Sequence, residues 1–210
     1  MRMDWVPVSA ALLLTGALAL GAGAFLLPTS GDSAETLSIV QDQGGQWMAA
    51  AVVLFLSSVF LTLGLPAILT LFQRRGWGLA MISGILLEIG FVGTAGFAML
   101  MVFFHSLVVA DAIKDPRFDA AASEAGLATF IAIWLAGLYL GELLLAIALL
   151  RAGFTPRWVS VALILHVASF PVSGLLPEVV SQATILLLVL GFAGIAIQAA
   201  SPEARRRLTR

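Results

Sequence analysis

The stretch GLYLGELLLAIALL (residues 137–150) decides the fold class, because it is almost entirely apolar and carries one ionisable side chain, Glu142. It belongs to an apolar run over about residues 127–150, and a helix needs about 20 such residues to cross a bilayer. The whole chain is 60% hydrophobic and 11% charged, whereas soluble domains are about 45–50% apolar and about 25% charged. The sequence therefore predicts an all-α, polytopic membrane protein.

Six apolar runs of this kind predict a six-transmembrane-helix bundle that forms a single domain over residues 1–210. The expected spans are 6–27, 47–72, 79–104, 127–150, 158–176 and 180–200. The first run can also be interpreted as a cleaved signal peptide, because ALALGAGA contains small-residue cleavage sites. We favour a retained span, because its about 22 apolar residues exceed the roughly 7–15 of a signal peptide.

The eleven Lys and Arg residues are divided unequally between the two sides of this topology. Two of them, Lys114 and Arg117, fall on the side of the longer loops. The others fall on the side of the termini: Arg2, Arg74, Arg75, Arg151, Arg157, Arg205, Arg206, Arg207 and Arg210. The positive-inside rule then predicts that both termini are cytoplasmic. No Lys/Arg run interleaved with aromatic residues indicates nucleic-acid binding, so the expected partner is the lipid bilayer.

Two longer loops, residues 28–47 and 105–126, are acidic and polar and are expected to face outward. Each contains a short apolar patch, at residues 37–40 and 107–110. Such patches predict short helices that lie on the outer membrane surface. The alternative is that these loops form a lid over an outward-facing cavity.

Three ionisable side chains lie well inside the spans, namely Glu88, Glu142 and His166. Each charged group in the centre of a span costs about 2.5–3.5 kcal/mol on insertion scales, so each needs a compensating partner. At about 1.5 Å per residue, all three fall about 12–15 Å from the cytoplasmic edge, near the middle of a core about 30 Å thick. We therefore expect Glu142 to pair with His166, with Glu88, or with both.

Further polar residues share helix faces with these three and are candidates for the same site. Tyr139 lies three residues before Glu142, while Ser169 and Ser173 lie three and seven residues after His166. Pro171 should free the carbonyl of Val167 for another partner. The second span adds a further polar stripe and a proline: Ser57, Ser58, Thr62 and Pro66.

The chemistry of this polar set has three interpretations. The residues can be structural groups that hold helices together, or they can form a proton relay or substrate pocket. Two carboxylates and one imidazole are also a valid ligand set for a first-row transition metal. The chain has no cysteine and none of the local His/Glu spacings typical of strong metal motifs. Glu88, Glu142 and His166 are therefore candidate metal ligands, and the identity of any cofactor is left open.

Glycines recur at three-residue spacing in two of the spans: Gly90, Gly93 and Gly96, and then Gly191 and Gly194. Small residues at such spacing allow helix backbones to approach closely. We expect these faces to mark helix contacts within the chain, or contacts with a second copy or a partner subunit.

Two segments, residues 74–91 and 151–170, echo each other in sequence. Both begin with Arg at an expected cytoplasmic turn, continue through Gly and an aromatic residue, and reach an ionisable residue, Glu88 or His166. The echo is consistent with two repeated hairpins in the same orientation. It is equally consistent with chance similarity between two apolar hairpins.

The segment GELLLAIALLRAGFTPRWVSVALILHVAS (141–169) resembles one that recurs in small bacterial six-helix membrane proteins of unknown function. In those proteins an apolar helix ends in Arg and is followed by a short Gly and Pro-Arg turn and another helix. The resemblance covers about a seventh of the chain and implies location in a bacterial cytoplasmic membrane. It implies no activity, so no functional residue is transferred from it.

Three function classes remain open. The chain can be a non-enzymatic binding or accessory subunit. In that case Gln or Asn in place of Glu88, Glu142 or His166 should lower only the stability of the protein. It can be a small proton-coupled transporter or carrier, which predicts a pH-dependent flux or binding signal. It can also be an intramembrane enzyme acting on lipid-like substrates, with a bound metal or substrate turnover as its signature.

Overall fold

The computed structural model describes residues 5–28, 33–72, 76–113 and 124–201, and all regular secondary structure in these ranges is helical. Six segments are long and apolar enough to cross a membrane, which confirms the predicted fold class. The helices are α1 (Val6–Leu26), α2 (Ser33–Asp42), α3 (Gly44–Thr70), α4 (Trp77–Val109), α6 (Ala125–Ala152), α7 (Arg157–Ser169), the 3-10 helix η1 (Phe170–Leu175), α8 (Glu178–Ala183) and α9 (Ile185–Ala200).

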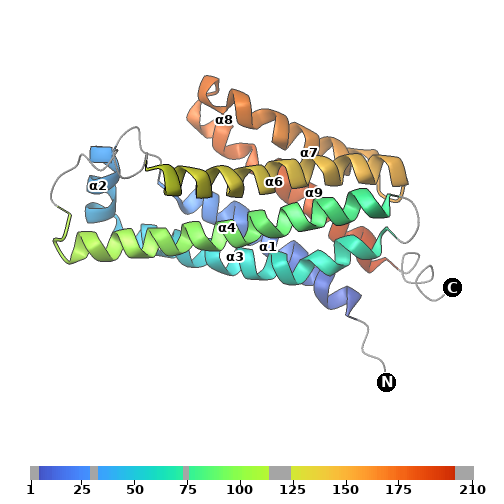
Figure 1. Cartoon of the computed structure of the whole chain (residues 1–210), viewed down its shortest axis with the longest axis horizontal. Coiled ribbons are helices and arrows are strands. Elements are labelled where there is room, and N and C mark those ends of the chain that lie inside the picture. Colours follow the sequence, from blue (N-terminus) through green and yellow to red (C-terminus); the bar gives the residue numbers. More distant parts are fainter. Residues whose placement is uncertain (1–4, 29–32, 73–75, 114–123, 202–210) are drawn as a thin grey trace.

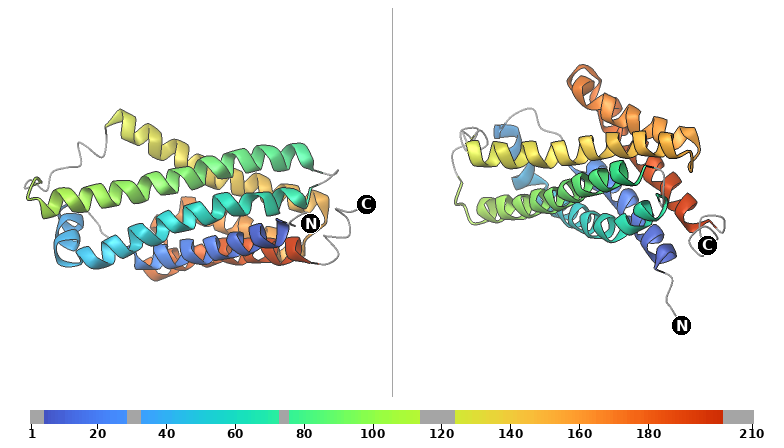
Figure 2. Two further views of the ribbon diagram at one scale, coloured as in Figure 1. Left: turned by 90° about the horizontal axis from the view of Figure 1, so that it is seen from below. Right: turned by 45° about the vertical axis from the view of Figure 1, so that its right-hand side comes forward.

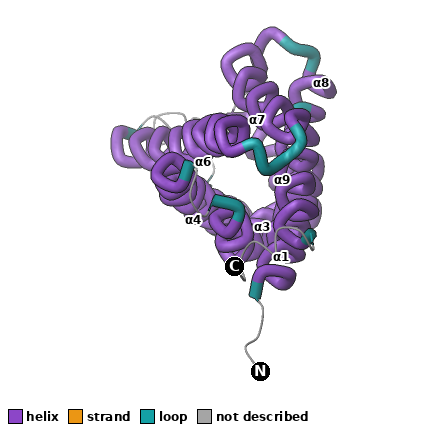
Figure 3. Tube along the Cα trace, turned by 90° about the vertical axis from the view of Figure 1, so that its right-hand side faces the viewer, coloured by secondary structure: helices purple, strands orange, loops and turns teal. Residues whose placement is uncertain are grey.

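The long helices follow one another around the bundle in chain order (Figures 1 and 3). Contacts join α1 to α3, α3 to α4, α4 to α6, α6 to α7 and α7 to α9, and α9 packs on α1 to close the bundle. Helices α6 and α7 are therefore neighbours, and α4 lies between α3 and α6. This arrangement decides which of the buried polar residues can meet.

The centre of the bundle is filled by apolar side chains from helices that are far apart in the sequence. Phe91 of α4 and Phe192 of α9 are both fully buried and meet edge to face, with their ring centroids 6.3 Å apart. The glycine-rich face of α4 packs against α6, where an added Cβ on Gly90 would lie 2.8 Å from the Cα of Leu138. The glycine stripes thus serve contacts within the chain.

The two longer loops differ from each other in the structure. Helix α2 forms within the first loop and packs on α3 and α4, where Leu37 and Val40 are buried, as expected for a short surface helix. In the second loop, α4 continues to Val109 and takes in most of the apolar patch. Residues 114–123, with Lys114 and Arg117, lie outside the described residues, as do Arg2, Arg74, Arg75 and the C-terminal arginines.

The hairpin of α7, η1, α8 and α9 leans away from the rest of the bundle at its α8 end (Figures 1 and 2). Helix α7 ends at Ser169 and continues as η1 because Pro171 has no backbone N–H for the next α-helical hydrogen bond. We expected this proline to free the carbonyl of Val167. That carbonyl accepts from the neighbouring N–H of Phe170 instead, as a 3-10 bond.

Pro66 lies inside α3, and Ser9 of α1 repairs the hydrogen bonding next to it. The Ser9 hydroxyl donates to the carbonyl of Leu63 at 2.9 Å and accepts from the N–H of Ala67 at 3.1 Å. These two backbone groups would bond each other in an unbroken helix. The serine hydroxyl therefore bridges these two backbone groups and joins α1 to α3.

Candidate functional site

His166 and Glu142 form a direct contact between α7 and α6. The Nδ1 atom of His166 lies 2.8 Å from Oε2 of Glu142. Glu142 is fully buried and His166 is 4% exposed. One proton lies along this line, either on the imidazole or on the carboxyl group. Of the two pairings that the sequence left open for Glu142, the structure forms the one with His166.

The direction in which the Glu142 side chain points follows from the glycine that precedes it on α6. An added Cβ on Gly141 would lie 2.8 Å from the backbone nitrogen of Leu87, and the hydroxyl of Ser83 donates to the Gly141 carbonyl at 2.8 Å. Gly141 therefore faces α4. The next residue is turned by about 100° around the helix axis, which directs Glu142 away from α4 and toward α7.

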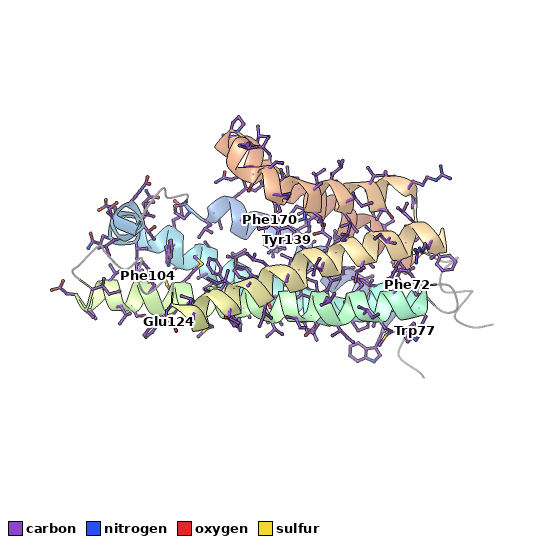
Figure 4. The ribbon with its side chains drawn as sticks, turned by 45° about the horizontal axis from the view of Figure 1, so that its top comes forward. Phe72, Trp77, Phe104, Glu124, Tyr139 and Phe170 are labelled. Carbon is purple, nitrogen blue, oxygen red and sulfur yellow. The ribbon has the colours of Figure 1, made fainter. Side chains whose placement is uncertain are left out.

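Tyr139 covers the imidazole of this pair. It lies one turn before Glu142 and stacks on His166, with 5.6 Å between ring centroids and 27° between ring planes. Its other neighbour is Phe170 of η1, with a centroid separation of 4.3 Å. Figure 4 shows Tyr139 and Phe170 side by side. Tyr139 and Phe170 therefore form an aromatic layer beside the pair.

Ser169 and Ser173 use their hydroxyls locally. Ser169 donates to the carbonyl of His166 at 2.6 Å, and Ser173 donates to the carbonyl of Phe170 at 2.8 Å. Both bonds join a side chain to the backbone three residues earlier. The two serines follow the stripe of His166, as expected, but they bond the backbone of their own segment rather than the carboxylate.

A buried oxygen of the pair is left without a hydrogen-bond partner in the part of the chain that the structure describes. Oε1 of Glu142 is buried and has no hydrogen-bond partner among the described residues. The hydroxyl of Ser160, six residues before His166 on α7, is in the same condition. Buried polar groups in proteins are almost always hydrogen-bonded, and this carboxylate oxygen is free to accept a hydrogen bond from a further group.

Glu88 lies in a different part of the bundle. Its Oε1 accepts from the hydroxyl of Thr62 on α3 at 3.2 Å, and it shares its helix face with Gly84, whose nearest neighbour is Leu69 of α3. Glu88 therefore faces α3, whereas Glu142 faces α7. No hydrogen bond or ion pair in the described structure joins Glu88 to Glu142 or His166.

A metal site built from all three residues is not formed. Among the residues that the structure describes, no group of three His, Asp or Glu side chains is placed to hold a metal ion. The matched positions of the sequence echo, Glu88 and His166, also lie in unlike surroundings: Glu88 is only partly buried and bonds Thr62, whereas His166 is buried and bonds Glu142.

Comparison of the chain with protein-family models, with curated proteins and with solved structures finds no match. Functional assignment therefore depends on the site geometry and on the membrane topology.

Proposed function

We propose that the protein is a small proton-coupled carrier in which the Glu142–His166 pair is the proton-binding site. The observation that carries this proposal is the direct contact of two buried ionisable side chains at 2.8 Å, with the second carboxylate oxygen unpartnered. Ionisable residues inside spans typically mark proton relays and substrate pathways. A pair retained for helix packing alone would gain from using both carboxylate oxygens.

The position of the pair gives it a way to affect the conformation of the bundle. It joins α6 to α7, and the α7 segment, Arg157–Leu175, has the smallest buried share of the six spans. An imidazole and a carboxyl group attract strongly as an ion pair and less when one of them changes its charge. Protonation and deprotonation would therefore alter the attachment of the α7–α9 hairpin to the bundle, and that is the element expected to move.

The proposed topology places both termini in the cytoplasm of a bacterial cell. Arg151 and Arg157 flank the α6–α7 turn, which lies at the same end of the bundle as the start of α1 and the end of α9 (Figure 1). The chain has no cysteine, so single cysteines report orientation directly. An impermeant maleimide should label Asp42→Cys in intact cells and label Arg157→Cys only after lysis. Labelling in the reverse order contradicts the proposed orientation.

The function is tested in lipid vesicles that contain a trapped pH indicator. We expect the wild-type protein to carry protons down an imposed pH gradient when potassium and valinomycin clamp the voltage. Glu142→Gln and His166→Ala should abolish this flux. Glu88→Gln is the matched control, since it removes a carboxylate from another part of the bundle, and it should retain the flux.

Equal flux in all four proteins would remove the pair from the proton path. Flux no greater than in protein-free vesicles would overturn the assignment of the pair as a proton path and leave it as a link between helices. Thermal unfolding of each variant in the same lipid establishes that a lost flux is not a lost fold.

A further inference from the structure

Glu88 lies at the surface of the bundle between two apolar grooves. One groove, of about 230 Å³, runs between α4 and α6, where Phe130, Ile133 and Trp134 form its far wall. The other, of about 310 Å³, runs between α3 and α4 against Leu65 and Leu69. Glu88 and Ile89 line both. We call these the α4–α6 groove and the α3–α4 groove.

Both grooves open toward the lipid. Ile89 is 40% exposed and Val92 is 58% exposed on α4, and Ile133 is 54% exposed on α6. Glu88 lies eleven residues after Trp77, the first residue of α4. This separation corresponds to about 16 Å along the helix, close to the middle of a hydrocarbon core about 30 Å thick. A lipid head group does not reach this depth.

The carboxylate of Glu88 is incompletely satisfied in this apolar setting. Thr62 donates to Oε1, but Oε2 has no hydrogen-bond partner in the described structure. Oε2 is itself covered by protein atoms, so a turn of the carboxylate is needed to bring it to either groove, and no hydrogen bond at Oε2 opposes that turn. A carboxylate in apolar surroundings is costly unless a donor or a cation is beside it.

The described helices supply no free cation to Glu88, because the His166 imidazole is bonded to Glu142 and no Lys or Arg lies at this depth. The Lys and Arg residues within them are Arg151 and Arg157, which lie at the ends of α6 and α7. A second copy of the same helices would bring none either. The complementary group is therefore a positively charged hydrogen-bond donor on a small apolar body, which can reach Glu88 from the bilayer.

We propose that Glu88 is the anchor of a lateral binding site for lipophilic amines. The protonated amine donates a hydrogen bond to Oε2 and pairs with the carboxylate, so that the complex has no net charge within the hydrocarbon core. The apolar body occupies one of the two grooves. Phe130 and Trp134 favour an aromatic body in the α4–α6 groove, because ring stacking and cation–π contact add to apolar burial. This site is separate from the Glu142–His166 pair and does not depend on its role.

The test uses 1-naphthylmethylamine as the probe and protein in phosphatidylcholine nanodiscs, which carry no net anionic lipid. Equilibrium dialysis should show one saturable site per wild-type chain. Glu88→Gln should weaken binding about tenfold or more, as expected for the loss of a hydrogen bond to a charged group. Glu142→Gln is the matched control and should bind like the wild type. The neutral analogue 1-naphthalenemethanol should bind the wild type about as weakly as the amine binds Glu88→Gln.

A second substitution tests amine binding without changing Glu88, so the test does not depend on how well Glu88→Gln folds. Ile89→Trp leaves the carboxylate in place and puts a larger side chain at a position that lines both grooves. It should therefore also weaken amine binding. Thr62→Ala removes the internal donor and should leave binding intact or strengthen it. Equal amine affinity in wild type and Glu88→Gln, unsaturable binding in every protein, or unchanged affinity in Ile89→Trp would overturn the proposal.

Discussion

Tyr139 stacks on the imidazole of His166 with 5.6 Å between the ring centroids, and it is the one tyrosine in the chain. A fluorine label on tyrosine therefore reports on this site alone. We predict one ¹⁹F resonance from 3-fluorotyrosine-labelled protein in nanodiscs. It should shift when the pH is changed, because a change of charge on the Glu142–His166 pair alters the electrostatic field at the stacked ring.

The assignment of that shift can be checked against the two histidines of the chain. His166→Ala should remove the pH-dependent shift. His105→Ala should retain it, because His105 lies near the C-terminal end of α4, beside Gly44 and away from Tyr139. A resonance that does not move with pH in the wild type would show that the Glu142–His166 pair does not change its charge at the pH values used. That result would count against a proton-binding role.

The energetic coupling of Glu142 and His166 is the second prediction. Each single substitution, Glu142→Ala or His166→Ala, leaves the other member buried without its partner, which costs about 1–3 kcal/mol or more. The double variant removes both groups and should lose less than the sum. Interhelical hydrogen bonds in membranes couple by about 0.6 kcal/mol on average and up to about 1.7 kcal/mol, and we expect the upper part of this range.

The measurement is the free energy of unfolding in a denaturing-detergent titration for the four members of the cycle. Additive losses would mean that the 2.8 Å contact contributes nothing to stability. The pair would then resemble a functional site more than a structural link.

The sequence was sufficient for the fold class because the spans are defined by one-dimensional hydropathy. The same pattern gave the depth of Glu88, Glu142 and His166, and it therefore predicted that Glu142 had a partner within reach. What it could not give is the direction of each side chain around its helix. Gly84 and Thr62 turn Glu88 toward α3, whereas Gly141 turns Glu142 toward α7.

Other contacts had no sequence signal at all. The indole N–H of Trp134, an unusual residue within a span, donates to Thr94 on α4 at 3.1 Å, and Thr94 in turn donates to the Gly90 carbonyl. Ser9 meets the Pro66 kink across 57 residues of sequence. Each of these pairings depends on which helices are neighbours, and apolar periodicity does not determine the neighbours of a span.

The third prediction concerns the Ser9 hydroxyl, which bridges Leu63 and Ala67 beside Pro66. Ser9→Ala should destabilise the protein by about 1–3 kcal/mol, because the N–H of Ala67 and the carbonyl of Leu63 both lose their bond to the Ser9 hydroxyl. The effect should depend on the proline. In a Pro66→Ala background the helix can form its regular ladder, so adding Ser9→Ala should cost little.

Thermal unfolding of wild type, both single variants and the double variant gives the comparison. If Ser9→Ala lowers the unfolding temperature equally in both backgrounds, Ser9 acts through packing against α3 rather than through its hydrogen bonds beside Pro66.

The fourth prediction tests the glycine contact that aligns α6 beside α4. In Gly90→Ala the new Cβ would lie 2.8 Å from both the Cα and the backbone nitrogen of Leu138. Backbone atoms cannot rotate away as a side chain can, so the two helices must separate. Overpacking of this kind costs about 1–3 kcal/mol. The separation should also lengthen the bond from Ser83 to the Gly141 carbonyl, which lies on the same seam.

Gly78 provides the matched control, because it lies on the same helix and an added Cβ there meets no atom within 4 Å. Gly78→Ala should be neutral or stabilising by up to about 1 kcal/mol, from helix propensity alone. The readout is the free energy of unfolding together with the ¹⁹F signal of Tyr139, which lies on α6 two residues from Gly141. Destabilisation by Gly90→Ala with a displaced Tyr139 signal would show that the α4–α6 contact sets the geometry of the Glu142–His166 pair. If Gly90→Ala and Gly78→Ala behave alike, the close approach at Gly90 is not what positions α6.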